Sequence, residues 1–271
     1  MSTIRLADLK GHWVLVTGAS AGIGRQFAVE LAAAGANLVL LARRKPLLDT
    51  LAAELESRYG IGTRTIDLDL ASPGAVSRVR QSLSSQRIRV RLLINNAGMQ
   101  SWASFDNLTW DAHRAMLELN MSALAELCHV LGPDLQSFPT SAVINLASPA
   151  AYQPVPFMAV YAASKAFVLS FSQALYGEWA PRGILVQALV VGPTDTPGFR
   201  KLGILEQGPF LGFDATCERV ARTSLAQLAK GSPVVIVASG TWKQRLFSTL
   251  FPPRMVIRTV SRMFHPPSGS P

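Results

Sequence analysis

Short apolar segments alternate along this chain with amphipathic stretches of helical length. The apolar segments lie at residues 13–17, 37–41, 64–68, 92–95, 142–146, 185–191 and 234–238. Each is too uniformly apolar for a strand with one solvated face, so each predicts a strand buried on both faces. The stretches between them are long enough for crossover helices. The alternation predicts an α/β protein with a single doubly wound parallel sheet of about seven strands and helices on both faces.

The chain contains no internal repeat and no linker, so one main domain is expected over residues 1–240. Its one long irregular stretch, 192–213, is rich in proline and glycine. Loops of this length in compact domains are usually functional lids or disordered, and we expect a lid over a binding site. Residues 241–271 form a basic, amphipathic C-terminal extension. Its end, 265–271, is rich in proline, glycine and serine and is expected to be disordered.

The composition bounds the class of protein. Apolar residues make up 49% of the chain and charged residues 16%, which predicts a large buried surface that can include a subunit interface. The two cysteines, Cys128 and Cys217, provide neither a disulfide framework nor metal-ligand spacing, which indicates a reduced, intracellular setting. Residues 1–13 lack the apolar core of a signal peptide, and no apolar run reaches about 18 residues. We therefore expect a cytoplasmic protein without a membrane-spanning helix.

The net charge of +9 is concentrated toward the C-terminal end. No acidic residue follows Glu218, whereas eight basic residues do, and this favours anionic partners. Arg254, Arg258 and Arg262 share one helical stripe beside apolar side chains. Such a segment can make peripheral contact with an anionic membrane surface, and it can equally pack on the domain or on a second subunit.

A second basic cluster surrounds the start of the fourth predicted strand. Its members are Arg78, Arg80, Arg87, Arg89 and Arg91. The cluster could receive an acyl carrier or the phosphates of coenzyme A, or it could be a solvated helix face. No base-reading motif or stacking platform accompanies the charge, so no nucleic-acid partner is expected.

A glycine-rich turn from Thr17 to Gly24 follows the first predicted strand and precedes a helical pattern. Glycine permits a tight turn and a close backbone approach, and a helix N-terminus presents N–H groups to a phosphate. The candidate cofactor-binding residues here are Gly18, Ser20, Ala21, Gly22, Ile23 and Gly24. The spacing is Gly-x-x-x-Gly-x-Gly rather than Gly-x-Gly-x-x-Gly, and alone it is also compatible with an ordinary turn.

Two arginines, Arg43 and Arg44, follow the second predicted strand, where an acidic residue would bind a ribose 2′-hydroxyl. A guanidinium group pairs well with phosphate, so this end of the strand favours NADP(H), with its 2′-phosphate. The alternative is that both are solvated surface charges. Asp69 and Leu70, after the third strand, are expected at the adenine edge.

Tyr161 and Lys165 lie four residues apart near the start of a strong helical pattern, so they share one helix face. A lysine ammonium beside a phenol favours the phenolate and is expected to lower its pKa. Tyr161 would then exchange a proton with a carbonyl or alcohol oxygen near neutral pH. Ser148 ends the fifth predicted strand, where its hydroxyl can donate a hydrogen bond to the substrate oxygen.

With these motifs in this order, the chain resembles the short-chain dehydrogenase/reductase family over roughly residues 9–238, and its main domain would be an NADP-binding Rossmann-like catalytic domain. The resemblance implies that Tyr161 is the general acid/base and that Lys165 holds the nicotinamide ribose. Ser148 would orient the carbonyl, and Asn120 would hold a water that connects Lys165 to a proton relay. Further implied cofactor contacts are Asn96, Ala97, Gly98, Thr194 and Thr196.

The chain departs from the family pattern at two places beside the nicotinamide. Val191-Gly192-Pro193 stands where the family usually has Pro-Gly, and Pro149 follows the catalytic serine. Both departures affect loop geometry and therefore substrate placement, while every catalytic group is retained.

The segments 99–102, 149–158 and 197–213 are the expected substrate walls. Their large apolar residues are Trp102, Tyr152, Phe157, Met158, Phe199, Leu202, Leu205, Phe210 and Phe213. We therefore expect hydride transfer between NADPH and an apolar ketone or secondary alcohol, such as a 3-oxoacyl thioester or a steroid-like compound. The alternatives are a non-catalytic NADP-binding regulatory or scaffold protein, and a sugar-nucleotide epimerase or dehydratase, whose usual glycine spacing is missing. The resemblance also implies a homodimer or homotetramer.

Overall fold

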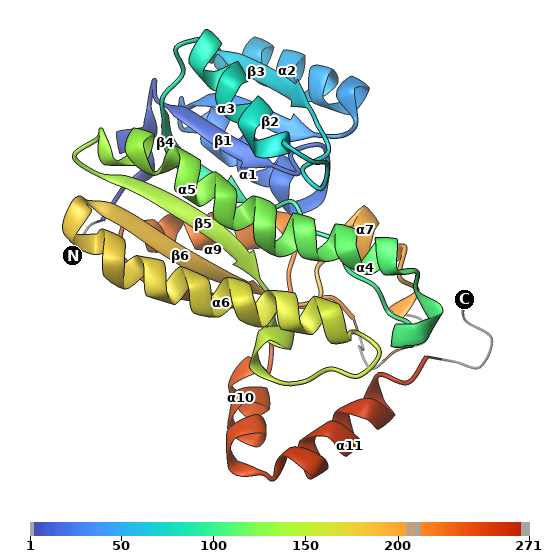
Figure 1. The fold of residues 1–271 in the computed structure, drawn as a ribbon. Coiled ribbons are helices and arrows are strands. Elements are labelled where there is room, and N and C mark those ends of the chain that lie inside the picture. The colour runs from blue at the N-terminus through green and yellow to red at the C-terminus, as the bar shows by residue number, and fades with distance from the viewer. Residues whose placement is uncertain (1–2, 205–207, 209–211, 267–271) are drawn as a thin grey trace.

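A computed structural model describes residues 3–204, 208 and 212–266. It contains a seven-stranded sheet in the order β3-β2-β1-β4-β5-β6-β7, in which all neighbouring strands run parallel (Figure 1). The strands are β1 (Trp13–Thr17), β2 (Asn37–Ala42), β3 (Thr63–Asp67), β4 (Val90–Asn95), β5 (Ser141–Ala147), β6 (Ile184–Val191) and β7 (Val234–Val237). The predicted doubly wound α/β fold is confirmed.

The two edge strands differ from the prediction that every strand is buried on both faces. In β3, Arg64 and Asp67 are exposed, and in β7, Ile236 is exposed. An edge strand has a neighbouring strand on one side only. The helices also cover an edge strand less completely than they cover the centre of the sheet. The central strands β1, β4, β5 and β6 are buried along nearly their whole length.

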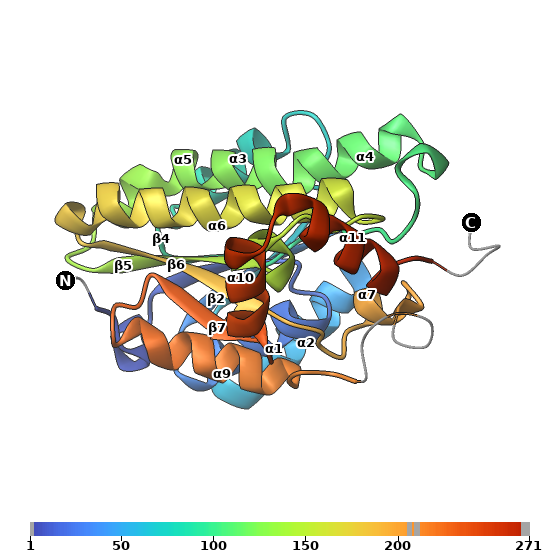
Figure 2. The ribbon, with the colours of Figure 1, turned by 90° about the horizontal axis from the view of Figure 1, so that it is seen from below.

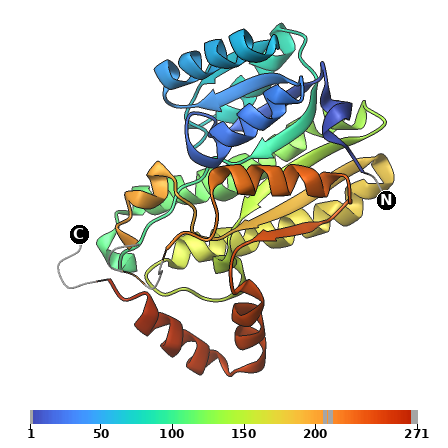
Figure 3. The same ribbon diagram turned by 180° about the vertical axis from the view of Figure 1, so that it is seen from behind.

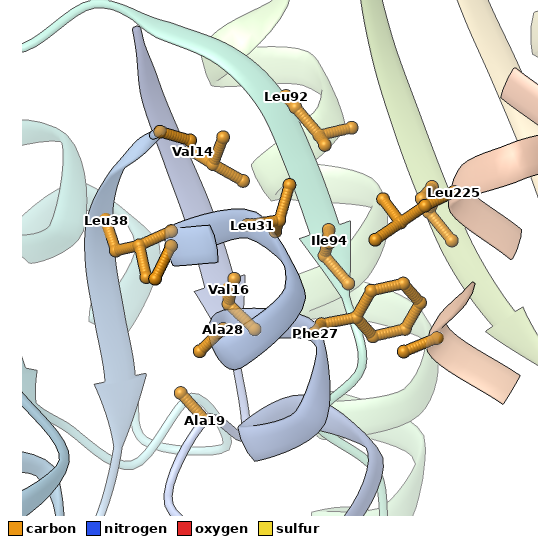
Figure 4. Packing of buried hydrophobic residues seen from close by; sticks show 14 of the residues in the cluster. Val14, Val16, Ala19, Phe27, Ala28, Leu31, Leu38, Leu92, Ile94 and Leu225 are labelled. Atoms are coloured by element: carbon orange, nitrogen blue, oxygen red, sulfur yellow. The ribbon is translucent and has the colours of Figure 1, made fainter. Parts of the chain in front are cut away.

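Helices cover both faces of the sheet (Figure 2). One face carries α1 (Gly22–Ala33), α2 (Lys45–Tyr59) and α9 (Cys217–Leu228), and the other carries α3 (Ala75–Ser85), α5 (Ala123–Gln136) and α6 (Ala159–Trp179). Figure 4 shows Phe27 and Leu31 of α1 in one apolar cluster with Val14 and Val16 of β1 and Ile94 of β4. These side chains are fully buried. Burial of each one stabilises the folded state by roughly 1.5–3 kcal/mol.

Shorter elements connect the layers. They are η1 (Leu6–Leu9), η2 (Phe105–Asn107), α4 (Trp110–Leu117), η3 (Glu118–Ser122), η4 (Pro149–Tyr152), η5 (Ala180–Arg182) and α7 (Pro197–Arg200). The chain ends in α10 (Thr241–Leu250) and α11 (Pro253–Met263), a hairpin that projects from the rest of the molecule (Figures 1 and 3). None of the helices in the described ranges has the length and apolar character needed to cross a membrane.

Part of the predicted lid lies outside the described residues, including Leu205, Pro209 and Phe210, and so do residues 267–271 of the tail predicted to be disordered. The described part of the lid contains α7.

Candidate active site

The parallel strands end at a cavity of about 1110 Å³. In a doubly wound sheet this edge, beyond the carboxyl ends of the strands, is where ligands bind. The predicted site residues that line the cavity are Gly18, Ala21, Gly22, Ile23, Arg43, Asn96, Ala97, Gly98, Ser148, Tyr161, Lys165, Thr194 and Thr196. The fold therefore brings the glycine-rich turn and the Tyr161 helix, far apart in sequence, to one space.

Tyr161 lies in the first turn of α6, and Ser148 directly follows β5. Ser148 also caps η4, since its hydroxyl accepts a hydrogen bond from the backbone N–H of Ala150 at 3.2 Å. Burial raises the pKa of Tyr161 above its usual value of 10, and a hydrogen bond with Ser148 opposes this rise. The expectation of a lowered pKa is therefore wrong, because burial outweighs the hydrogen bond and Tyr161 holds its proton.

Lys165 is one turn further along α6 and is only 7% exposed. Its Nζ donates a hydrogen bond to the carbonyl oxygen of Leu146 at 2.8 Å and lies 5.8 Å from the centre of the Tyr161 ring. Burial lowers the pKa of Lys165 to about 8. A Cβ at Gly98 would lie 3.3 Å from Asn120 Oδ1, a tight contact, and 3.6 Å from Lys165 Nζ, an ordinary one. The ammonium is thus held beside the phenol while part of its hydrogen-bonding capacity still faces the cavity.

Asn120 lies in η3, a π-helical turn between α4 and α5. Its side chain accepts from the backbone N–H of Met99 and donates to the carbonyl oxygen of Met99, both at 2.8 Å, and it donates to Ser164 Oγ at 3.0 Å. Asn120 therefore fastens the turn after β4 to α6, the helix that carries Tyr161. It does not itself line the cavity, and its expected role in holding a water stays a prediction.

The glycine-rich turn has the features of a phosphate site. Helix α1 begins after Ala21, which gives no side-chain cap, so N–H groups of the first turn lack a side-chain partner. Gly18 and Gly22 have φ values of +67° and +56°, which favour glycine. A Cβ at Gly24 would lie 2.4 Å from the carbonyl oxygen of Gly18, so the turn closes only with glycine there. These residues fit the pyrophosphate of a dinucleotide.

Thr17 is a site residue that sequence reasoning did not single out. Its Oγ1 accepts hydrogen bonds from the backbone N–H groups of Asn96 and Ala97 at 2.9 and 3.0 Å. Asn96 in turn donates its side-chain amide to the carbonyl oxygens of Thr17 and Gly18 at 2.9 and 3.3 Å. Asn96 thus braces the glycine-rich turn against the turn after β4, and residues of both turns line the cavity. The part of the cavity lined by these two turns is called the cofactor half. The sequence signal that could have identified Thr17 is its position as a hydroxyl residue at the end of β1.

The two arginines after β2 have different partners. Arg43 lines the cavity, and its Nη1 lies 3.6 Å from Asp69 Oδ2. Arg44 lies outside the cavity lining and donates to Ser20 Oγ at 2.8 Å. Leu70, expected at the adenine edge, packs instead into the core beneath α3. A guanidinium is therefore available at the end of β2, where a 2′-phosphate would lie.

The C-terminal hairpin forms a wall of the substrate half of the cavity. Trp102 donates its Nε1–H to the carbonyl oxygen of Phe264 at 2.7 Å, and Gln244 donates to the carbonyl oxygen of Pro149 at 2.9 Å. An apolar cluster joins the hairpin to the other walls. Its members include Trp102, Val155, Phe157, Met158, Phe199, Leu202, Phe247, Val256, Val260 and Phe264. The sequence left open whether this segment packs on its own domain or on a second subunit. These contacts show that it packs on its own domain.

The basic cluster near β4 has no part in this cavity. Arg80 pairs with Asp134 at 2.8 Å, and Arg91 donates to the carbonyl oxygen of Thr140 at 3.0 Å. Arg91 lies near the amino end of β4, whereas the cavity lies beyond the carboxyl ends of the strands. The structure therefore favours the solvated or structural alternative for these arginines.

Residues 12–204 match the family described as short chain dehydrogenase, and the chain belongs to this family. Membership confirms the predicted resemblance to the short-chain dehydrogenase/reductase family. The chain is 32% identical over 224 residues to a very-long-chain 3-oxoacyl-CoA reductase of Pyrenophora tritici-repentis, covering 80% of this chain and 66% of that protein. A human protein of the same name is 30% identical over 188 residues, covering 66% of this chain and 58% of that protein. The chain thus spans less than two thirds of the length of these relatives.

Solved structures show the same architecture over more of the chain. A short-chain dehydrogenase from Sphingobium yanoikuyae in complex with NADPH is 33% identical, with a TM-score of 0.78, covering 86% of this chain and 91% of that one. A 7beta-hydroxysteroid dehydrogenase structure is 26% identical, with a TM-score of 0.82, covering 95% of this chain and 100% of that one.

Proposed function

We propose that this protein is an NADP(H)-dependent oxidoreductase that reduces a lipophilic ketone or oxidises the corresponding secondary alcohol. The observation that carries the proposal is the placement of Ser148, Tyr161 and Lys165 where the two halves of the cavity meet. One half of the cavity is lined by the glycine-rich turn and by Arg43, which follows β2. The other half is lined by members of the apolar cluster. A carbonyl at the junction would meet both the cofactor and the proton donor.

The residues of the chain account for the proton side of the reaction. NADPH, held by the glycine-rich turn and Arg43, would supply the hydride that the carbonyl carbon takes up. Tyr161 would then give its proton to the carbonyl oxygen as that oxygen gains charge. The raised pKa of Tyr161 keeps this proton in place until the oxygen becomes basic. Ser148 lies within hydrogen-bonding reach of Tyr161 and can orient the same oxygen, while Lys165 supplies positive charge that stabilises the phenolate left behind.

Three features support a lipophilic substrate. Part of the apolar cluster lines the cavity, namely Val155, Met158, Phe199, Leu202, Phe247, Val260 and Phe264, while Trp102, Phe157 and Val256 pack behind this lining. Lys201 and Lys243 also line the cavity and suit a substrate whose apolar body carries an anionic group, as an acyl thioester of coenzyme A does. Two relatives carry the name very-long-chain 3-oxoacyl-CoA reductase, and a similar structure is a 7beta-hydroxysteroid dehydrogenase. We favour a 3-oxoacyl thioester, with a steroid ketone as the second candidate.

The test is NADPH consumption by the full chain against 3-oxoacyl-CoA esters of increasing chain length, steroid ketones and small polar ketones. The proposal expects kcat/KM to rise with the apolar size of the substrate. A preference for small polar ketones would contradict the lipophilic assignment. NADPH binding without turnover of any carbonyl or alcohol in the panel would instead favour the non-catalytic alternative.

We also propose a homo-oligomer formed through α6. Phe167 and Phe171 stack on this helix with ring centres 5.4 Å apart and are only partly buried within one chain. Light scattering of the purified protein tests this, and a strictly monomeric mass would contradict it.

A further inference from the structure

The α10–α11 hairpin has two chemically different faces. The inner face is apolar and belongs to the cavity wall: Phe247 of α10 lines the cavity, and Val256 and Val260 of α11 are each 2% exposed. The outer face is turned away from the domain, and its composition is not that of an ordinary solvated surface.

On α10 the outer face is an apolar stripe. Trp242, Leu246 and Leu250 follow one another at intervals of four residues and are 67%, 50% and 67% exposed. Lys243, which also lines the cavity, and Arg245, whose guanidinium lies over the Tyr152 ring at 5.8 Å, flank the stripe on the same helix. Large apolar side chains gathered on one exposed helix face mark a contact surface, because water solvates them unfavourably.

On α11 the outer face is cationic. Arg254, Arg258 and Arg262 repeat at intervals of four residues, and all three are exposed. Within the described ranges, none of the three arginines forms an ion pair, and no acidic residue follows Glu218 anywhere in the sequence. Met255 borders the arginine stripe and is 47% exposed. An apolar ridge beside a row of cations matches the boundary between acyl chains and anionic headgroups.

We propose that the α10–α11 hairpin docks on an anionic lipid bilayer, with Trp242, Leu246 and Leu250 at the acyl boundary and the arginine stripe against lipid phosphates. A second copy of this chain fits the same face poorly. A symmetric contact would bring two arginine stripes together, and the segment offers no carboxylate to separate them. Because Phe247 and Val260 of the hairpin line the cavity, docking would place the cavity wall next to the lipid. The proposal concerns where the protein sits and does not depend on its reaction.

Deleting the hairpin would be a poor test, because deletion also removes part of the cavity wall. Point variants on the outer face avoid this, since none of the replaced residues lines the cavity. The apolar variant is W242S/L246S/L250S, and the cationic variant is R254Q/R258Q/R262Q. The control is R87Q/R89Q/R182Q, which removes the same number of charges from exposed arginines near the amino ends of β4 and β6, on the opposite edge of the sheet.

The experiment measures flotation of the full chain with vesicles of phosphatidylcholine alone and of phosphatidylcholine with phosphatidylserine. The wild-type protein and the control should bind the anionic vesicles, more weakly as salt is raised. The cationic variant should bind them roughly 100-fold more weakly, since three charges near the surface are lost. The apolar variant should lose binding by about the same factor, through loss of buried apolar area.

Several outcomes would overturn the proposal. They are absence of wild-type binding to anionic vesicles, full binding by either outer-face variant, and an equal loss in the control. Circular dichroism and NADPH binding of each variant check that the fold is retained. If a variant fails this check, the vesicle-induced blue shift of tryptophan fluorescence is compared between the wild-type protein and W242F. Loss of the shift in W242F supports docking through α10. An unchanged shift in W242F contradicts it. A change in oligomeric state without vesicle binding would assign the face to a second copy instead.

Discussion

The buried Lys165 beside Tyr161 makes the stability of this protein depend on pH in a way that one substitution can isolate. The pKa of Lys165 falls from 10.5 to about 8 because burial penalises its charged form. As pH rises above 8, the folded protein releases this proton, whereas the unfolded chain keeps it until about pH 10.5. The unfolded state then binds more protons, so the contribution of Lys165 to the free energy of unfolding rises with pH in this window.

The size of this rise follows from the shift. Between pH 7 and pH 9.5 the contribution of Lys165 should increase by roughly 2 kcal/mol, at about 1.4 kcal/mol for each unit of pH beyond the folded pKa. Other groups act in the opposite direction. Burial raises the pKa of the Cys128 thiol to about 12, and it raises that of Tyr161, so the folded protein keeps their protons longer than the unfolded chain does. Their contributions fall as pH rises.

The assay therefore compares wild type with Lys165→Met, because the effect of Cys128 cancels in the difference. The range ends at pH 9.5, below the raised pKa of Tyr161, so Tyr161 adds little to the difference. Urea unfolding, followed by tryptophan fluorescence at pH 7, 8, 9 and 9.5, gives the free energy of unfolding of each protein. The difference, wild type minus variant, should rise by roughly 2 kcal/mol over this range. A difference that stays constant would refute the reasoning, because it would mean that Lys165 titrates near its ordinary pKa and is not buried as described.

Three further predictions concern separate parts of the cavity. Arg43→Gln should weaken NADPH binding about tenfold, the cost of one exposed charge-assisted contact, and leave NADH binding unchanged, as measured by fluorescence titration; an equal effect on both cofactors would contradict this. Gly24→Ala should abolish NADPH binding or lower the melting temperature, because its Cβ would lie 2.4 Å from the carbonyl oxygen of Gly18; calorimetry and binding identical to wild type would refute the packing of the turn. Trp102→Phe removes the hydrogen bond to Phe264 and should cost about 1 kcal/mol of stability and raise KM for lipophilic ketones more than for small ones; equal changes in KM would exclude a role in the substrate wall.

The sheet was predictable because its central strands are buried on both faces and are therefore apolar without interruption. The prediction of burial on both faces failed at Arg64 and Asp67 of β3, which are exposed. Strand order places β3 at the edge of the sheet, and an apolar segment of sequence does not reveal that order. The cofactor half was also predictable, since Gly18 to Gly24 and the Tyr161–Lys165 pair are local patterns on single elements.

The substrate half depends on contacts between distant parts of the chain. Trp102 meets Phe264 across 162 positions, and no local pattern marks that pair. The raised pKa of Tyr161 was also not predictable, because it results from burial by several elements that are distant in the sequence. The four-residue spacing between Tyr161 and Lys165 contains no information on that burial. Thr17 was overlooked because its hydroxyl acts on a turn that lies 79 positions further along the chain.

The central claim is that Tyr161 delivers the proton in an NADPH-dependent reduction, and Tyr161→Phe tests it most directly. The measurement is kcat with a 3-oxoacyl-CoA or steroid ketone that the wild type reduces, together with the Kd for NADPH. The account predicts that kcat falls at least about 100-fold, the usual contribution of a general acid, while the Kd changes less than about twofold. A Phe variant that keeps most of its turnover would contradict the claim.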